Sequence, residues 1–76
     1  MNEETLKKIE AYQRNEITEH ILYGILAKRY RGGNSEILKK ISGDELRHYN
    51  FFKKITGKEM RPDRLKIFFY RFASRI

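Results

Sequence analysis

Arg31-Gly32-Gly33-Asn34-Ser35 separates two long segments of helical periodicity and predicts a sharp reversal of the chain. The arginine suits the negative end of a helix, glycine allows a left-handed stop, and Asn34 or Ser35 can cap the start of a following helix. We therefore expect an all-α fold built on a long helical hairpin.

The periodicity on both sides of this turn sets the helix bounds. Apolar, aromatic and ionisable side chains recur at alternating steps of three and four, first before the turn and then after it as far as the stop signal Gly57. Pro62 is placed to open a third helix. The predicted helices are 3–30, 35–56 and 62–76, within a single domain 1–76. Their stripes are Ile9, Tyr12, Glu16, Glu19, Tyr23, Leu26 and Tyr30; Leu38, Ile41, Glu45, His48, Phe52 and Ile55; and Leu65, Phe68, Phe69, Phe72 and Ile76. The first two stripes are called the seam below.

Composition limits the classes of protein that this chain can be. A single domain of 76 residues buries a modest core, so we expect self-association. The absence of cysteine excludes disulfides and thiolate metal sites. No apolar run could span a bilayer and no export signal opens the chain, so we expect a cytoplasmic protein. The net charge of +7 is spread along all segments.

A polar layer interrupts the apolar seam. Glu16 and Glu19 in the first helix align with Glu45 and His48 in the second, among Ile, Leu, Phe and Tyr. Buried carboxylates need compensation, which a divalent metal supplies. Ligands three residues apart on a helix point the same way, so Glu45 can bridge two metals while His48 binds one of them. Carboxylate with imidazole favours iron, or manganese, over magnesium or calcium.

Ligand counting makes this site depend on a second chain. A carboxylate-bridged di-iron site in a helix bundle takes one Glu from each of two helices and one Glu-x-x-His from each of two others. This chain contains one Glu of the first kind and one Glu-x-x-His, which is half of that set. A homodimer, or a higher oligomer, would bring two irons together inside a four-helix bundle. Tyr23 lies two turns after Glu16 on the same face, where it could serve as a catalytic electron donor or hydrogen-bond a ligand, or simply pack as an aromatic.

Two segments carry a resemblance to a known family. Asn15-Glu16-Ile17-Thr18-Glu19-His20-Ile21-Leu22-Tyr23 and Asp44-Glu45-Leu46-Arg47-His48-Tyr49 resemble the first half of the ferritin-like domain of the rubrerythrin and ferritin superfamily. The variant fused to vacuolar-iron-transporter-type membrane proteins is most similar, because a segment like Thr56-Gly57-Lys58-Glu59-Met60-Arg61-Pro62 follows its helix-two motif.

The resemblance covers most of residues 10–76 and implies a site and an activity. It implies iron ligation at Glu16, Glu45 and His48, a position beside the site for Tyr23, and oxidation of Fe(II) with dioxygen or peroxide in iron storage, detoxification or delivery. The chain departs from the family because the second half of the domain, with its own Glu and Glu-x-x-His, is absent. Either another copy supplies it, as in two-helix encapsulated ferritins, or the chain is a fragment whose partner is a membrane iron-transport domain; the third helix, stopping without a cap, favours truncation.

Other readings of single residues stay open. Ser42-Gly43-Asp44-Glu45 can be a capping box that breaks the second helix and turns Glu45 outward. Glu19 is either an additional metal ligand or a salt-bridged surface residue. For His20 we expect a solvated or hydrogen-bonded side chain.

Two alternative functions involve no metal chemistry. A basic helical module could bind nucleic acid or another protein, although the long helices do not suit groove reading and nucleic acid is the less favoured partner. The segment 64–72 could lie on a membrane surface as a basic amphipathic helix, although we expect Leu65, Phe68 and Phe72 to pack on the hairpin or on a neighbouring chain.

Overall fold

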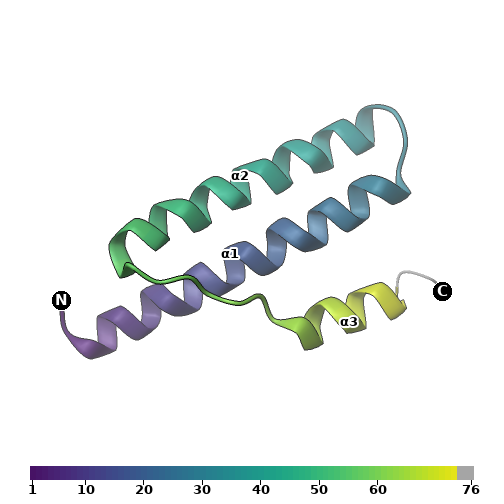
Figure 1. Ribbon diagram of the computed structural model, residues 1–76. Coiled ribbons are helices and arrows are strands. Elements are labelled where there is room, and N and C mark those ends of the chain that lie inside the picture. The colour runs from purple at the N-terminus through teal and green to yellow at the C-terminus, as the bar shows by residue number, and fades with distance from the viewer. Residues whose placement is uncertain (74–76) are drawn as a thin grey trace.

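Three helices account for the fold of residues 1–73, which are the residues that the computed structural model describes (Figure 1). They are α1 (Glu3–Arg29), α2 (Gly33–Thr56) and α3 (Arg64–Ala73), and no strand occurs in this range. α1 and α2 run antiparallel and side by side, and α3 packs against α1. The all-α hairpin with a third helix is therefore confirmed.

The turn between α1 and α2 reverses the chain at Gly32, whose φ of 68° suits glycine. α2 begins at Gly33, two residues earlier than predicted. Its N-cap residue is Gly32, which has no side chain with which to cap the helix. The prediction that Asn34 or Ser35 caps α2 is wrong, because both lie inside its first turn. Ser35 is buried and its hydroxyl donates instead to the Ala27 carbonyl on α1, at 2.7 Å.

Small and polar side chains outside the seam form part of the contact between α1 and α2. The Ser42 hydroxyl donates to the His20 carbonyl at 2.8 Å, and the Thr56 hydroxyl donates to Gln13 Oε1 at 2.8 Å. Residues seven apart on a helix share one face. We call this set the hairpin stripe: Gln13, His20 and Ala27 on α1, with Ser35, Ser42, Tyr49 and Thr56 on α2.

The connector 57–63 is tied to both helices of the hairpin by side chains that bond its backbone. Gly57 ends α2 in the left-handed conformation (φ 69°, ψ 14°), which confirms the predicted stop. Gln13 Nε2 donates to the Lys58 carbonyl at 2.7 Å, the Met60 amide donates to the Tyr49 hydroxyl at 3.1 Å, and the Asp63 amide donates to Thr18 Oγ1 at 2.8 Å. These bonds fix where α3 starts.

α3 begins at Arg64, two residues later than predicted, because Asp63 rather than Pro62 starts it: Asp63 Oδ1 accepts from the Lys66 amide at 3.1 Å. The predicted end of this helix, with Ile76, lies outside the described residues. Leu65, Phe68 and Phe72 are all exposed, so they do not pack on the hairpin, and packing on a neighbouring chain is the part of the sequence-based expectation that stays a prediction. No helix within residues 1–73 has the length and apolar character needed to cross a membrane.

Candidate metal centre

The structure brings Glu16, Glu45 and His48 together in the middle of the hairpin. His48 Nδ1 lies 3.1 Å from Glu16 Oε2 and 3.6 Å from Glu45 Oε1, and one donor atom from each residue lies within 4.8 Å of the others. Glu45 and His48 come from adjacent turns of α2, and Glu16 comes from α1. The sequence predicted all three as ligands, while Glu19, the fourth candidate, is not among the donor atoms of this group.

The cluster is open on one side. The side chains of Glu16 and Glu45 are 20% and 14% exposed, whereas that of His48 is 57% exposed. The carboxylates are thus largely withdrawn from water while the imidazole lies at the surface. A second protein surface could therefore reach the cluster from the side of His48.

Glu19 joins the cluster through Glu45. The pKa of Glu19 is raised, first by a hydrogen bond with the Glu45 carboxylate and then by burial, against a lowering by the Lys66 ammonium. The pKa of Glu45 is also raised, mainly by burial, with the neighbouring Glu16 acting in the same direction. The carboxyls of Glu19 and Glu45 therefore hold protons more tightly than isolated carboxyls would.

The spacing of the donor atoms fits a metal ion. Bonds of about 2.1 Å place two neighbouring ligand atoms of an octahedral ion about 3.0 Å apart. The separations of 3.1 and 3.6 Å from His48 Nδ1 to the two carboxylates are close to this value. An ion bound there would also offset the charge of the two carboxylates, which burial makes costly.

The capping-box reading of Ser42 and Glu45 is excluded. α2 runs without a break from Gly33 to Thr56. Ser42 is buried against α1, and His20 Nδ1 lies 2.8 Å from its carbonyl and 3.0 Å from its hydroxyl. His20 is hydrogen-bonded, as predicted, and is occupied by the helix contact rather than by the cluster.

Tyr23 lies beside Glu19 and makes no hydrogen bond with the three ligand candidates in the described part of the chain. It is half-buried and lines a hollow of about 150 Å³ between α1 and α3. Lys66 and Tyr70 enter this hollow from α3, and no sequence signal could have found them, because their position depends on the bonds that hold the connector. The hollow is lined by Glu19, Leu22, Tyr23, Leu26, Lys66 and Tyr70.

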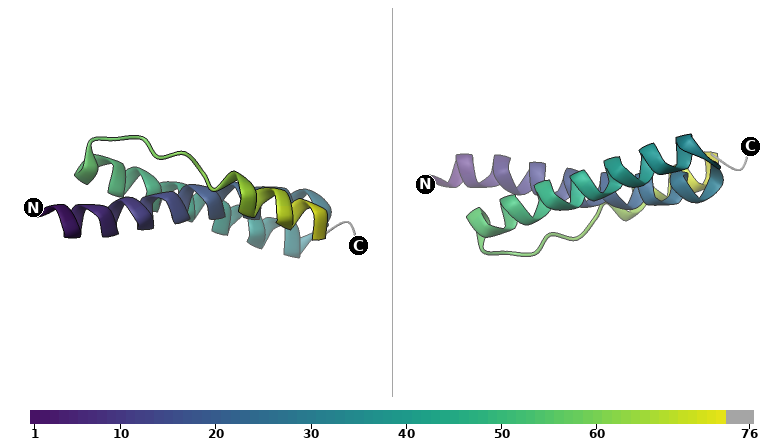
Figure 2. Two further views of the ribbon diagram at one scale, coloured as in Figure 1. Left: turned by 90° about the horizontal axis from the view of Figure 1, so that it is seen from below. Right: turned by 90° about the horizontal axis from the view of Figure 1, so that it is seen from above.

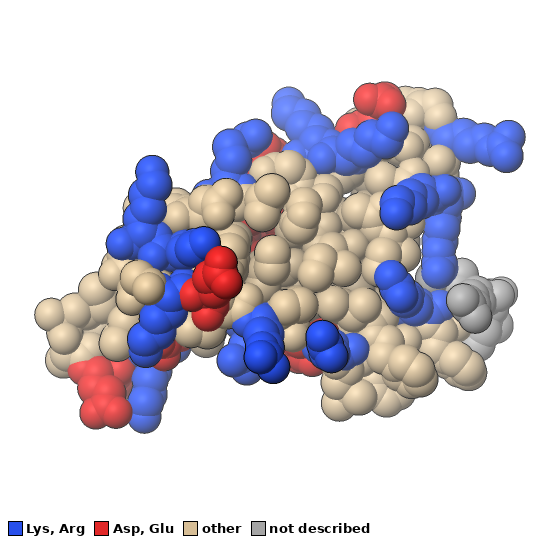
Figure 3. Space-filling view, in the orientation of Figure 1, with Lys and Arg blue, Asp and Glu red and all other residues tan. Residues whose placement is uncertain are grey.

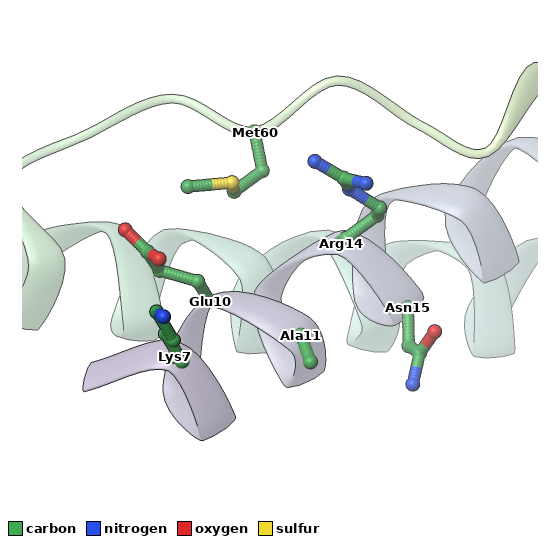
Figure 4. Close-up of a pocket in the computed structure, with 6 residues that line it drawn as sticks. All are labelled: Lys7, Glu10, Ala11, Arg14, Asn15 and Met60. Carbon is green, nitrogen blue, oxygen red and sulfur yellow. The ribbon is translucent and has the colours of Figure 1, made fainter. Parts of the chain in front are cut away.

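A larger hollow under the connector shows no such convergence of ligands. Figure 4 shows the Met60 side chain pointing from the connector toward α1, between Glu10 and Arg14, while Asn15 points away. Its volume is about 330 Å³, and its one carboxylate, Glu10, is paired with Lys58 at 2.9 Å. The cluster around Glu45 is therefore the stronger candidate for a functional site.

No family model, no curated protein and no solved structure matches this chain. A function must therefore be argued from the residues of the cluster and from the surface around it.

Proposed function

We propose that the chain is half of a ferritin-like domain, that two copies hold a pair of iron ions between them, and that the site oxidises Fe(II) with dioxygen or peroxide. The observation that carries this proposal is the convergence of Glu16, Glu45 and His48. Two carboxylates and one imidazole per chain are half of the donor set of a di-iron carboxylate protein. Manganese fits the same donors and stays an alternative metal.

The surface around the cluster supports a second copy as the missing half. At one end of the seam, the rings of Tyr12 and Phe52 stack across α1 and α2 with centroids 6.2 Å apart. At the other end, an apolar hollow of about 280 Å³ is lined by Leu26, Tyr30, Asn34, Ile37 and Leu38. Tyr12, Tyr30 and Ile37 are all exposed large side chains. A symmetric contact over this face would cover both apolar ends and bring two ionisable clusters together.

Each residue of the cluster has a role in this proposal. Glu45 lies between Glu16, Glu19 and His48 and is suited to bridge two ions, with Glu16 and His48 as terminal ligands. Glu19 can exchange its bond with Glu45 for a metal ion, which would admit and release iron. Bound Fe(II) would supply the electrons, and Tyr23, next to Glu19 in the hollow, is placed to supply a further one. We place this activity in the cytoplasm, since a chain without cysteine gains nothing from an oxidising compartment.

Figure 3 shows basic side chains scattered over the visible face, with acidic ones among them, rather than gathered in a stripe that could follow a phosphate backbone. The charge distribution on this face therefore does not support a nucleic-acid-binding function.

The test is an iron titration of the metal-free protein in air. We expect a near-ultraviolet absorbance from ferric iron that saturates at two irons per dimer, on the ligand count above. The double variant Glu45→Ala, His48→Ala should lose this signal. Glu36→Ala, which removes an exposed carboxylate of α2, is the matched control and should keep it. Uptake that is unchanged in the double variant would refute the proposal.

A further inference from the structure

The most apolar face of α3 points away from the rest of the protein. At about 100° per residue, Leu65, Phe68, Phe69 and Phe72 fall within an arc of roughly 100°. Their exposed fractions lie between 60% and 66%. We call these four residues the α3 outer face. Such a concentration of exposed apolar side chains on one short helix marks a surface that binds something.

The opposite side of α3 is the one held by the hairpin. The Thr18 hydroxyl on α1 accepts from the Asp63 amide at the start of the helix. Ile67 is half-buried, and Lys66 and Tyr70 line the hollow shared with α1. The orientation of the helix is therefore set at its cap and along its length, so the outer face cannot turn inward without breaking these contacts.

The outer face and the seam are different surfaces. α3 touches α1 but not α2 within the described residues, and it lies along the opposite edge of α1 from α2 (Figure 1). The seam meets α3 at the hollow lined by Glu19, Tyr23 and Leu26, on the side of α3 away from its outer face, so the occupant of the outer face need not be the copy that covers the seam.

Charge identifies the class of that occupant. α3 contains Arg64, Lys66 and Arg71 and no acidic residue, and the exposed Arg61 precedes it. The nearest carboxylate in sequence, that of Asp63, accepts the Lys66 amide as the helix cap. A second copy of α3 would bring only like charges to the contact. An anionic lipid surface offers both a phosphate layer for the cations and an apolar boundary for the rings.

We propose that α3 binds the surface of an anionic lipid bilayer, lying in the plane of the interface. The side chains of the α3 outer face enter the boundary between headgroups and acyl chains, and Arg64 contacts lipid phosphates from the flank of this face. The hairpin then holds its carboxylate cluster close to the membrane surface. This inference is independent of the metal chemistry proposed above.

Vesicle binding tests the proposal with the whole chain. We expect cosedimentation with vesicles of equal parts phosphatidylcholine and phosphatidylglycerol, and little with phosphatidylcholine alone. Phe68→Ser with Phe72→Ser should abolish binding, and Arg64→Gln should weaken it roughly fivefold, the usual contribution of one cation near such a surface. Phe51→Ser is the control, because Phe51 is an exposed ring on α2, away from the α3 outer face, and its loss should not change vesicle binding.

A spectroscopic readout covers the case in which the serine variant does not fold. The chain contains no tryptophan. Phe69→Trp therefore adds a single reporter on the outer face. Its emission should shift to the blue with anionic vesicles and be quenched by lipids brominated on the acyl chain. Equal binding to both kinds of vesicle would overturn the proposal, and so would the absence of both the blue shift and the quenching. It would also be overturned if the native chain binds no vesicles and the double variant Phe68→Ser, Phe72→Ser loses self-association, because the outer face would then be a contact between copies.

Discussion

Glu45 is the residue on which the candidate site depends, because three ionisable side chains meet at it. It shares a hydrogen bond with Glu19, lies near Glu16, and its Oε1 is 3.6 Å from His48 Nδ1. Burial raises the pKa of Glu45, and the hydrogen bond with Glu45 raises that of Glu19, so both carboxyls favour a bound proton more than free carboxyls do. Metal binding and proton binding therefore compete for the same atoms.

The raised pKa values of Glu19 and Glu45 predict how pH acts on the stability of the metal-free protein. A carboxyl whose pKa is raised by folding stabilises the folded state below its ordinary value of 4.5, and this contribution is lost as pH rises through the folded pKa. Glu19→Gln removes one of these titrations. As pH rises above 4.5, the native protein should therefore lose stability that the variant does not lose, so the free energy of unfolding of the variant should rise relative to that of the native protein. Urea unfolding followed by circular dichroism, with Glu36→Gln as control, measures this gain; a constant difference at every pH would contradict it.

Competition with protons also predicts the pH dependence of metal binding. Because Glu45 must lose any bound proton before it can bind an ion, and burial raises its pKa, Mn(II) affinity should rise with pH and binding at mildly acidic pH should release protons. Calorimetric titration in buffers of different ionisation enthalpy counts the released protons. Glu45→Gln should bind more weakly and with a smaller pH dependence. Binding that is independent of pH would show that the ion is held elsewhere.

At the scale of elements, the sequence predicts the helices better than their contacts. The number and order of helices follow from periodicity and from Gly32 and Gly57, which need only local information. Glu16, Glu45 and His48 could be predicted as one cluster because they recur in phase on two helices joined by a short turn. The hairpin stripe could not, since Gln13 and Ser42 look like surface residues until partners more than 20 positions away satisfy their polar groups.

Gln13 provides the test of that stripe. Its side chain is fully buried, donates to the Lys58 carbonyl and accepts from the Thr56 hydroxyl. Gln13→Leu removes both bonds and leaves the Thr56 hydroxyl and the Lys58 carbonyl their mutual contact at 3.4 Å, so it should lower the free energy of unfolding by about 1–3 kcal/mol, the net contribution of two hydrogen bonds. Asn15→Leu, at an exposed position two residues away, should change it by less than about 0.5 kcal/mol. Equal effects of the two substitutions in chemical unfolding would mean that the connector is not held by Gln13.

Two glycines, Gly43 inside α2 and Gly57 at its C-cap, allow the effect of backbone strain to be measured separately from that of packing. A Cβ added at Gly43 or at Gly57 meets no atom within 4 Å, but only Gly57 has a positive φ, of 69°. Gly57→Ala should therefore destabilise the fold by about 1–2 kcal/mol. Gly43→Ala should stabilise it by up to about 1 kcal/mol, because alanine favours a helix interior. Thermal unfolding of the two variants should shift in opposite directions; shifts of the same sign would contradict the left-handed C-cap.

At the scale of the whole molecule, the single chain lacks the thickness of a stable core. Its helices lie nearly in one layer, and its smallest extent is 14 Å (Figure 2). The buried apolar residues among those described are Leu22, Ala27 and Tyr49, whereas many larger apolar side chains are exposed. A layer of this kind gains stability by covering a face with another protein surface. The seam is the face whose covering would also complete the candidate site.

The oligomeric state is therefore predicted to control both stability and iron oxidation. The native chain should sediment as a dimer whose unfolding midpoint rises with protein concentration, because association stabilises only the folded chain.

Tyr30→Lys with Ile37→Lys places two charges in the apolar hollow at one end of the seam and leaves the ligands unchanged. This variant should be a monomer that unfolds more easily. Phe69→Lys adds a charge at an exposed ring of α3 outside the seam, so it should leave the dimer intact. If the seam variant is a monomer, it should also lose the paired-iron absorbance although Glu16, Glu45 and His48 are unchanged, since each chain then keeps only half of the donor set. A monomeric variant that oxidises iron like the native protein would show that one chain suffices, and would move the site from between two copies to within a single hairpin.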